Sequence, residues 1–313
     1  MTINKNKNKW ETFISFLKWK KELDPPKTFK DKFLYQVKEW GIVLVLFLFL
    51  NNFVIASFVV PTGSMENEVM TGDFLLVNKF IYGGTSPRNI MFTNVRLPWF
   101  RLPKFKEVER GDVIVFEFPG YREEVKPEAF TYYLKRCLAL PGDKLQIIDR
   151  VIYINNVPAP LPRHVNFNSP FGLPNTYSDS RIFPQLSQFN EDNYGPVVIP
   201  FKGMKVELSY TNFQNWETFI KREGHKIELQ GDGNIRIDGV LKSDYTVEED
   251  YLFGIGDNRD NSLDSRYWGF IPKENLVGTP MFVYWSWDTN LPLTNIFGKL
   301  ESIRFNRVGT LIK

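Results

Sequence analysis

The sequence is poor in cysteine and histidine, and this narrows the chemistry open to it. Among its 313 residues there is one cysteine, and there are two histidines, His164 and His225. A single cysteine excludes an intramolecular disulfide and argues against a cysteine-based zinc site. Two histidines exclude a histidine-rich metal centre, and a Ser–His–Asp mechanism would depend on one of them. We therefore expect no metal site.

The chain also has little net charge, +3 at pH 7, which is too small to indicate a nucleic-acid partner. The charge is unevenly placed, since residues 1–39 contain ten lysines and five acidic residues. Within this basic tail Trp10, Phe13, Ile14 and Leu17 follow one another at helical spacing. This pattern is compatible with a short helix on an anionic membrane face or with a solvated tail.

The longest uncharged run, from Trp40 to Met65, predicts a transmembrane helix at residues 40–60. Twenty helical residues rise about 30 Å, which matches the hydrocarbon core of a bilayer. Asn51 and Asn52 near its middle are costly in lipid and suggest a tilt or a partner. A buried core helix and a cleaved secretory signal are the alternatives. Because lysine is concentrated before the span, we expect the N-terminus in the cytoplasm and the rest outside it.

After this span the sequence has the character of a β protein. Short runs of apolar and β-branched residues recur between turns that are rich in glycine and proline. No convincing amphipathic helix of useful length is expected in this part of the chain, and residues 212–222 are the best candidate for one. Residues 158–200 have little periodicity and are expected to be irregular. The expected strands include residues 74–77, 112–118 and 281–284, and hairpins are expected at residues 144–154 and 226–237.

Four polar clusters could carry chemistry, at residues 61–65, 110–116, 133–143 and 256–269. Taken singly, each is explained by a turn, an edge strand or a polar loop. A serine nucleophile, however, needs a base and an oxyanion hole, and with histidine so scarce the natural base is lysine. Its pKa must then fall from about 10.4 toward 7–8, which burial among apolar groups achieves. Lys135 has such neighbours in sequence.

Together and in this order, the four clusters resemble the type I signal peptidases, the membrane-bound Ser–Lys proteases of bacteria. The match covers roughly residues 40–155 and 250–310. It implies a mainly β fold, in which an N-terminal transmembrane helix precedes a large β-rich catalytic domain with an inserted cap region. The expected division is a cytoplasmic basic tail at residues 1–39, a transmembrane helix at 40–60, a catalytic core at 61–155 and 246–313, and the insertion at 156–245.

The resemblance implies a role for several individual residues. Ser64, in Thr-Gly-Ser-Met, would be the nucleophile, and Lys135, in Tyr-Leu-Lys-Arg, would be the general base. The backbone N–H of Ser64 and the hydroxyl of Thr62 would form the oxyanion hole. Shallow pockets for small substrate side chains would be lined by Val60, Pro61, Met65, Tyr133 and Leu134.

Supporting roles fall on the last cluster. Ser262 would hydrogen-bond to the lysine amine and orient it, and Asp264 would pair with Arg266 to hold the loop against the site. Asp257 would pair with Arg136.

The chain departs from the family pattern at two positions beside the nucleophile. Members often have proline three positions after the serine, where this chain has Asn67, and many have serine where Thr62 stands. Both changes leave the dyad intact and put the geometry of the substrate groove in doubt.

The expected function is removal of N-terminal signal peptides from exported preproteins, with cleavage after small residues in Ala-x-Ala-like sequences and without a cofactor. The expected location is the bacterial inner membrane, with one span and a periplasmic or otherwise extracytoplasmic catalytic domain. A self-cleaving repressor-like protease is one alternative, but no helix-turn-helix precedes Ser64. A catalytically silent membrane-anchored β protein that binds exported chains is the other.

Overall fold

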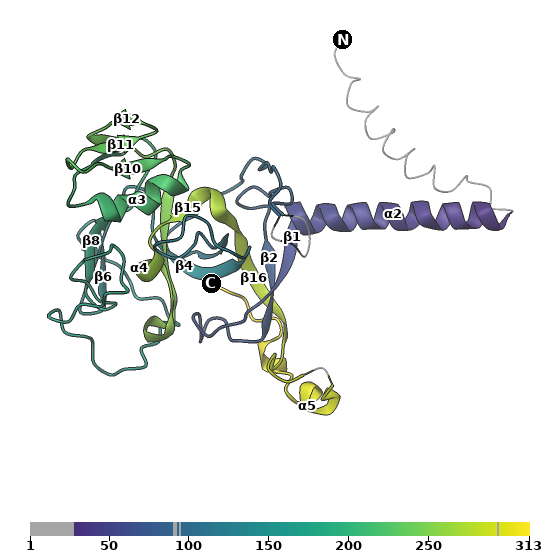
Figure 1. Cartoon of the computed structure of the whole chain (residues 1–313). Helices are drawn as coiled ribbons and strands as arrows, with labels where there is room; N and C mark the ends of the chain where they lie inside the picture. The colour runs from purple at the N-terminus through teal and green to yellow at the C-terminus, as the bar shows by residue number, and fades with distance from the viewer. Residues whose placement is uncertain (1–27, 90–92, 94, 293) are drawn as a thin grey trace, which may run out of the picture. The chain divides into compact units, whose positions relative to one another are not determined.

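The computed structural model describes residues 28–89, 93, 95–292 and 294–313. The chain divides into two compact units, Met1–Phe49 and Leu50–Lys313. The tail helix expected around residues 10–17 lies outside the described residues. Figure 1 shows the β-rich second unit, so the expected mainly β fold after an N-terminal apolar helix is confirmed.

Helix α2 (Phe29–Phe53) is long and apolar enough to cross a membrane. Its first turn is capped by Thr28, whose hydroxyl accepts a hydrogen bond from the N–H of Asp31 at 3.2 Å. The Asp31 carboxylate in turn accepts from the N–H of Thr28 at 3.3 Å. This reciprocal cap explains why the helix begins at Phe29, well before Trp40.

The expectation that the helix continues to Val60 is wrong. Residues Ile55–Val59 form strand β1, which pairs antiparallel with strand β2 (Asp73–Asn78). An apolar run of this kind suits either a helix or a strand, and the presence of a pairing partner decides between them. Because α2 ends at Phe53, Asn51 and Asn52 lie in its last turn and not in the middle of an apolar span.

The main sheet has seven antiparallel strands in the order β1-β2-β16-β3-β4-β14-β15. Strand β16 pairs with β2 on one side and β3 on the other, so segments far apart in sequence lie side by side (Figure 1). The bounds of the remaining strands are β3 (Val113–Glu117), β4 (Tyr132–Ala139), β14 (Tyr251–Ile255), β15 (Ile271–Pro272) and β16 (Leu276–Ser286).

Strand β3 shows how the sheet separates two parts of the core. Its successive side chains point to opposite faces, as in any strand. Val113 and Val115 join the apolar cluster that contains Met65, whereas Ile114 and Phe116 join the cluster on the other face. The strand is buried along its whole length, which accounts for its continuous apolar sequence.

The second unit also contains smaller sheets. One of them includes the hairpin of strands β5 (Lys144–Ile148) and β6 (Val151–Ile154). The predicted hairpins are confirmed, and the best helix candidate of this part of the chain forms helix α3 (Phe213–Arg222). The expectation that residues 158–200 are irregular is wrong for strand β8 (Tyr194–Val198). This strand pairs with β5 at the edge of its sheet, and an edge strand tolerates Pro196. The other strands are β7 (Val157–Pro158), β9 (Lys205–Glu207), β10 (Ile227–Leu229), β11 (Ile235–Ile237), β12 (Val240–Leu241) and β13 (Asp244–Thr246).

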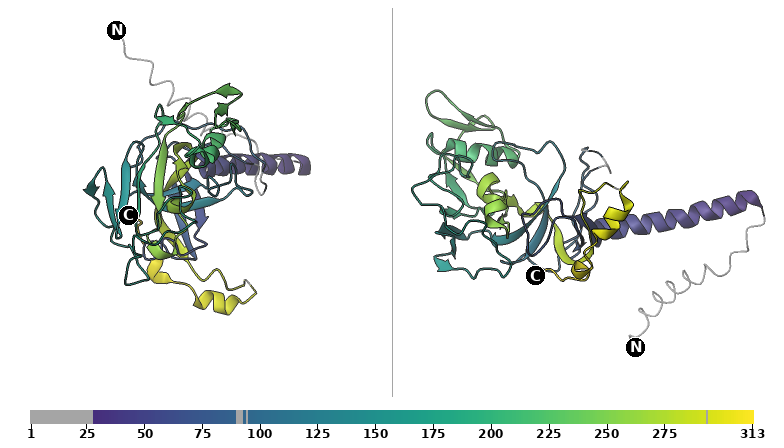
Figure 2. Two further views of the ribbon diagram at one scale, coloured as in Figure 1. Left: turned by 60° about the vertical axis from the view of Figure 1, so that its left-hand side comes forward. Right: turned by 90° about the horizontal axis from the view of Figure 1, so that it is seen from below.

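The two ends of the second unit are formed by different elements. The sheet of β10, β11 and β12 lies at one end of this unit, together with α3, and β1 and β2 lie at the opposite end (Figure 1, Figure 2). The short helices are α4 (Ser265–Trp268), α5 (Ile296–Glu301) and the 3₁₀ turns η1 (Arg259–Asn261), η2 (Lys273–Asn275) and η3 (Phe305–Arg307).

Candidate active site

Ser64 lies in the turn that follows strand β1. The base of this turn is held by the sheet, since the N–H of Val60 donates to the carbonyl of Asp73 at 2.9 Å. The N–H of Gly72 donates back to the carbonyl of Val60, also at 2.9 Å. The backbone thus leaves the sheet at a fixed point and carries the Ser64 side chain toward strand β4.

Lys135 lies in the middle of strand β4, opposite Ile114 of strand β3. The residue is 3% exposed. Its Nζ donates a hydrogen bond to Ser64 Oγ over 2.6 Å, across a separation of 71 residues in sequence. The two residues expected to form the dyad are therefore in direct contact.

The environment of Lys135 favours the neutral amine. Burial lowers the pKa of its ammonium group from 10.5 to about 8. The Asp264 carboxylate acts in the opposite direction, and the Arg266 guanidinium reinforces the effect of burial. An appreciable fraction of the amine is then unprotonated near neutral pH, as a general base requires.

The dyad lines an apolar groove with a volume of about 460 Å³. All five residues expected to contact substrate line this groove. Strand β1 and the nucleophile turn also contribute Phe58, Val59 and Thr62, and the last cluster contributes Asn261 and Leu263. The walls therefore come from β1, β4 and the loop around Ser262. This loop lies 195 residues after the nucleophile turn in the sequence, counted from Gly63 to Asn258.

Two hydrogen-bond donors beside Ser64 have no partner among the described residues. These are the backbone N–H of Ser64 and the hydroxyl of Thr62, which is exposed in the groove. Both are the donors expected to form an oxyanion hole. An oxyanion hole needs donors that are not already engaged, and these two meet that requirement.

Asp264 and Arg266 form a buried two-bond ion pair. Arg266 Nε and Nη2 donate to the carboxylate at 2.9 and 2.8 Å. The same carboxylate accepts the N–H of Gly256 at 3.1 Å, and Arg266 Nη2 donates to the carbonyl of Arg259 at 2.7 Å. Burial raises the pKa of Asp264, but Arg266, Lys135 and the Ser262 hydroxyl together hold this pKa below its usual value. The pair thus ties together both ends of the loop.

Asp257 and Arg136 form a second buried pair, as expected. Arg136 Nε and Nη2 donate to the two carboxylate oxygens at 2.8 and 2.6 Å. Because Arg136 follows Lys135 in strand β4, this pair fastens the start of the loop to the strand that carries the amine.

The hydrogen bond expected between Ser262 and the Lys135 amine is absent. Ser262 Oγ is buried next to the Asp264 carboxylate, whose pKa it helps to lower, and it makes no hydrogen bond to the Lys135 amine. It occupies the space beside Gly256, where a Cβ on that glycine would lie 2.2 Å from Ser262 Oγ. The amine instead donates to Ser64, so the structure gives Ser262 a packing position next to the site.

Asn258 contacts the nucleophile turn directly, and sequence reasoning assigned it no role. Its N–H donates to the carbonyl of Ser64 at 3.1 Å, and its Nδ2 donates to the carbonyl of Gly63 at 3.1 Å. Its place in the same run as Asp257 was the available signal. That run identified the loop as important but did not indicate which residue reaches Ser64.

The two histidines have other partners. His164 Nε2 lies 3.0 Å from a Glu68 carboxylate oxygen, and His225 lies between Asp238 and Glu248. Neither is hydrogen-bonded to Ser64. Within the described part of the chain, no three His, Cys, Asp or Glu side chains are placed to hold a metal ion.

A serine hydroxyl in contact with a buried amine is the arrangement that a serine hydrolase with a lysine base requires. Comparison with known sequences identifies the family. Residues 34–285 match the model of the family described as signal peptidase, peptidase S26. The chain belongs to this family of signal-peptide-processing proteases.

Relatives support the same assignment over most of the chain. The signal peptidase I of Rickettsia bellii (strain OSU 85-389) is 31% identical over 293 residues, which cover 87% of this chain and 83% of the relative. That of Buchnera aphidicola subsp. Schizaphis graminum is also 31% identical, and the match covers 84% of this chain and 76% of the relative. A comparison of structures finds the crystal structure of a signal peptidase I from Enterococcus faecalis V583, which is 22% identical in sequence. The match covers 56% of this chain and 97% of that chain, with a TM-score of 0.26.

The family match and the two relatives that are 31% identical confirm the expected family and imply serine peptidase activity. Together with the apolar helix α2, they indicate a protein anchored in a membrane.

Proposed function

We propose that the protein is a membrane-anchored endopeptidase that removes N-terminal signal peptides with Ser64 as nucleophile and Lys135 as general base. The observation that carries this proposal is the 2.6 Å contact between Lys135 Nζ and Ser64 Oγ at the wall of the groove. A lysine whose pKa is about 8 is able to act as a base at working pH. Family membership supplies the substrate class.

The proposed reaction begins when the neutral amine of Lys135 takes the proton of Ser64 Oγ. The oxygen attacks the scissile carbonyl carbon, and the carbonyl electron pair moves to its oxygen. The N–H of Ser64 and the hydroxyl of Thr62 donate to this oxyanion. The C–N bond then breaks, and the Lys135 ammonium gives its proton to the leaving amine.

The resulting ester at Ser64 is hydrolysed by the same groups in reverse roles. Lys135 takes a proton from water as the water attacks the ester carbonyl. The proton then passes to Ser64 Oγ as the C–O bond breaks, which frees the cleaved signal peptide and restores the site. No further group is needed to balance the protons.

The groove supports a preference for small side chains before the cleaved bond, as in Ala-x-Ala sequences. Val60 and Met65 are buried parts of its wall and are packed in the core, so neither is able to move aside for a large residue. We expect a peptide with phenylalanine in place of the alanine next to the cleaved bond to lose most of its kcat/KM.

The proposed topology places the N-terminus in the cytoplasm and the β-rich body outside, which is the periplasm of a cell with an outer membrane. The lysine-rich tail before α2 supports it. A reporter enzyme that is active only in the cytoplasm, fused after Lys313, should be silent. An active reporter would contradict this orientation.

Cleavage of a fluorogenic Ala-x-Ala peptide by the full chain in detergent tests the proposed activity. Ser64→Ala and Lys135→Ala should each remove nearly all turnover, and Lys135→Arg should also fail because a guanidinium stays protonated. Lys79→Met is the matched control, since Lys79 is also buried and has a pKa of about 8, but donates to the carbonyl of Asn51. Residual turnover of a tenth or more in Lys135→Ala would exclude the dyad.

A further inference from the structure

A segment of the inserted region lies directly along the loop that holds the nucleophile. We call residues 164–171 the strap. The N–H of Asn166 donates to the carbonyl of Asp257 at 2.8 Å, and its carbonyl accepts the N–H of Arg259 at 2.9 Å. These two bonds form a parallel β-bridge between Asn166 and Asn258, and they hold the residues on either side of Asn258.

Asn258 joins the strap to the nucleophile. On one side its Oδ1 accepts a hydrogen bond from Asn168 Nδ2 of the strap at 3.4 Å. On the other side its N–H and Nδ2 donate to the carbonyls of Ser64 and Gly63, both at 3.1 Å. The position of Ser64 therefore depends on a residue that the strap holds in place.

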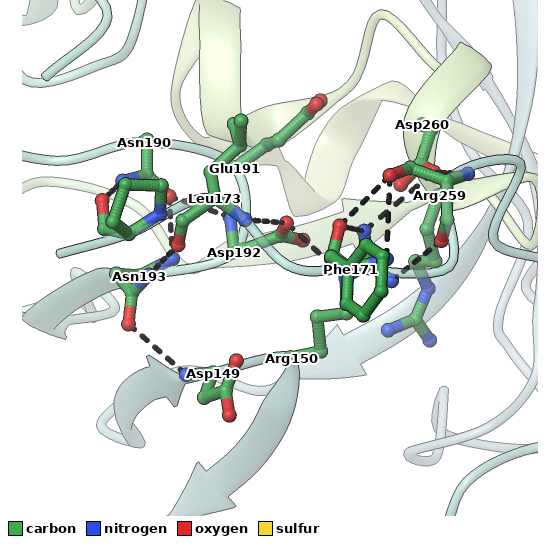
Figure 3. Close-up of polar contacts among 12 residues, drawn as sticks. Asp149, Arg150, Phe171, Leu173, Asn190, Glu191, Asp192, Asn193, Arg259 and Asp260 are labelled. Carbon is green, nitrogen blue, oxygen red and sulfur yellow. Dashed lines mark hydrogen bonds and ion pairs between the residues drawn. The ribbon is translucent and has the colours of Figure 1, made fainter. Parts of the chain in front are cut away.

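Arg150 fastens the strap. This arginine lies at the tip of the β5–β6 hairpin, and Figure 3 shows its side chain directed toward Phe171 and Asp192. Its Nη1 donates to the carbonyl of Ser169 at 2.9 Å and its Nη2 to that of Phe171 at 2.7 Å. Its Nε lies 3.2 Å from Asp192 Oδ2. Its guanidinium also covers the ring of Phe167, with the central carbon 4.5 Å from the ring centroid.

The strap is attached to the catalytic loop a second time at Asp260. The N–H of Ser169 donates to Asp260 Oδ2 at 2.8 Å, and Arg150 Nη2 lies 3.8 Å from the same oxygen. At its other end the strap contacts the nucleophile side, where His164 Nε2 lies 3.0 Å from Glu68 Oε2. One guanidinium thus organises two carbonyls of the strap and a carboxylate of the catalytic loop.

We propose that the strap positions the nucleophile and that Arg150 is the positioning residue that holds the strap. Asn258 transmits its effect to Ser64, so that Ser64 Oγ stays within reach of Lys135 Nζ. The proposal rests on the proposed function, in that Ser64 and Lys135 are taken as the reacting pair. It gives the inserted region a task in catalysis, and Arg150 itself does not touch the substrate groove.

The test is Arg150→Ala in the full chain, with kcat and KM measured on the fluorogenic peptide. Since a displacement of about 1 Å from a distant mutation lowers turnover as much as 10²-fold, we expect kcat to fall at least about tenfold with KM within about twofold. Amide hydrogen exchange in residues 256–262 should become faster. Arg236→Ala is the matched control, because Arg236 holds only the carbonyl of Gly239 in another turn of the same region.

Asp260 provides a second pair of variants in case Arg150→Ala does not fold. Asp260→Ala removes the acceptor for Ser169 and should lower kcat, whereas Asp260→Asn keeps an oxygen there and should restore most of it. An unchanged kcat in Arg150→Ala, or a raised KM with kcat unchanged, would overturn the proposal. So would faster exchange without loss of kcat.

The two proposals fail in different ways. If the unmodified protein does not cleave the peptide, the proposed function fails, and the exchange rates of residues 256–262 still report whether Arg150 holds the loop. If it cleaves the peptide and Arg150→Ala changes neither exchange nor kcat, only the positioning role of the strap is refuted.

Discussion

Replacing Lys135 by methionine should abolish peptide cleavage and, near neutral pH, make the folded protein more stable. Methionine keeps an unbranched apolar chain in the same space and removes the amine. Lys135 lies in strand β4 and is only 3% exposed. The charged form of its amine is therefore disfavoured in the folded state relative to the unfolded chain. A group that serves the reaction therefore opposes folding.

The size of the effect follows from the pKa. The pKa of Lys135 falls from 10.5 in the unfolded chain to about 8 in the fold, which corresponds to about 3 kcal/mol of lost stability below pH 8. Losing the hydrogen bond to Ser64 costs the variant about 1 kcal/mol. We expect a net gain of about 2 kcal/mol at pH 7.

The sign of the difference should change with pH. Between pH 8 and 10.5 the unfolded chain binds more protons than the folded one at Lys135, so the stability of the unmodified protein rises with pH. Above pH 10.5 both states are neutral, and only the lost hydrogen bond remains. Lys135→Met should then be less stable by about 1 kcal/mol, with the crossing between about pH 9 and 10.

Urea unfolding of the full chain in detergent, followed by tryptophan fluorescence at several pH values, measures this difference. Trp268 is buried in the core and should report the transition. Lys79→Met is the control, because it should show a gain of the same sign and keep its activity. If Lys135→Met were less stable than the unmodified protein at pH 7, or if its gain did not vary with pH, the assignment of a desolvated amine would be refuted.

Three further outcomes are expected. The kcat/KM of the free enzyme should rise with pH as Lys135 loses its proton. The rise should have its midpoint near pH 8 and amount to about tenfold from pH 7 to the plateau. A profile that is flat from pH 6 to 10 would contradict a lysine base. Thr62→Val should lower kcat about 10²–10³-fold with KM little changed, while Thr62→Ser should stay close to the unmodified protein, and a fully active valine variant would remove this hydroxyl from the oxyanion hole. Gly256→Ala should lose activity because its Cβ would lie 2.2 Å from Ser262 Oγ and 2.4 Å from the Ser64 carbonyl oxygen. Adding Ser262→Gly should not restore the activity, because the contact with the Ser64 carbonyl oxygen remains.

The pairing of Ser64 with Lys135 could be expected because the four clusters, each of which has a structural explanation of its own, occur together and in the order of the signal peptidase family. Scarcity of histidine pointed to lysine, and the apolar neighbours of Lys135 pointed to a lowered pKa. The structure places them 2.6 Å apart. The pairs Asp264–Arg266 and Asp257–Arg136, which the same resemblance implies, are also present.

The boundary at Phe53 could not be expected, because its cause lies elsewhere in the chain. Residues 53–60 are apolar except for Ser57, and a helix and a buried strand are equally compatible with that run. Strand β2 settles the matter by pairing with residues Ile55–Val59. Tertiary pairing of this kind is invisible to a reading of local periodicity.

The strap was invisible for a related reason. Residues 164–171 contain no regular period and no charged pair, and their order comes from backbone groups that bond to Asp257, Arg259 and Arg150. Backbone contacts leave little trace in composition. A polar, aperiodic stretch therefore had the same appearance as a loose surface loop, although it borders the catalytic loop.

The surroundings of Lys135 explain why the site needs so many buried charges that never meet the substrate. Asp264 beside the amine would by itself stabilise the ammonium and raise the pKa of Lys135, which would remove the base. Arg266 donates two hydrogen bonds to that carboxylate and offsets its field, so burial remains the dominant influence on the amine. A carboxylate able to fix the loop through the Gly256 N–H is thereby compatible with a neutral lysine next to Ser64. The ion pair therefore holds the loop and also allows the pKa of Lys135 to stay low, which neither residue could do alone.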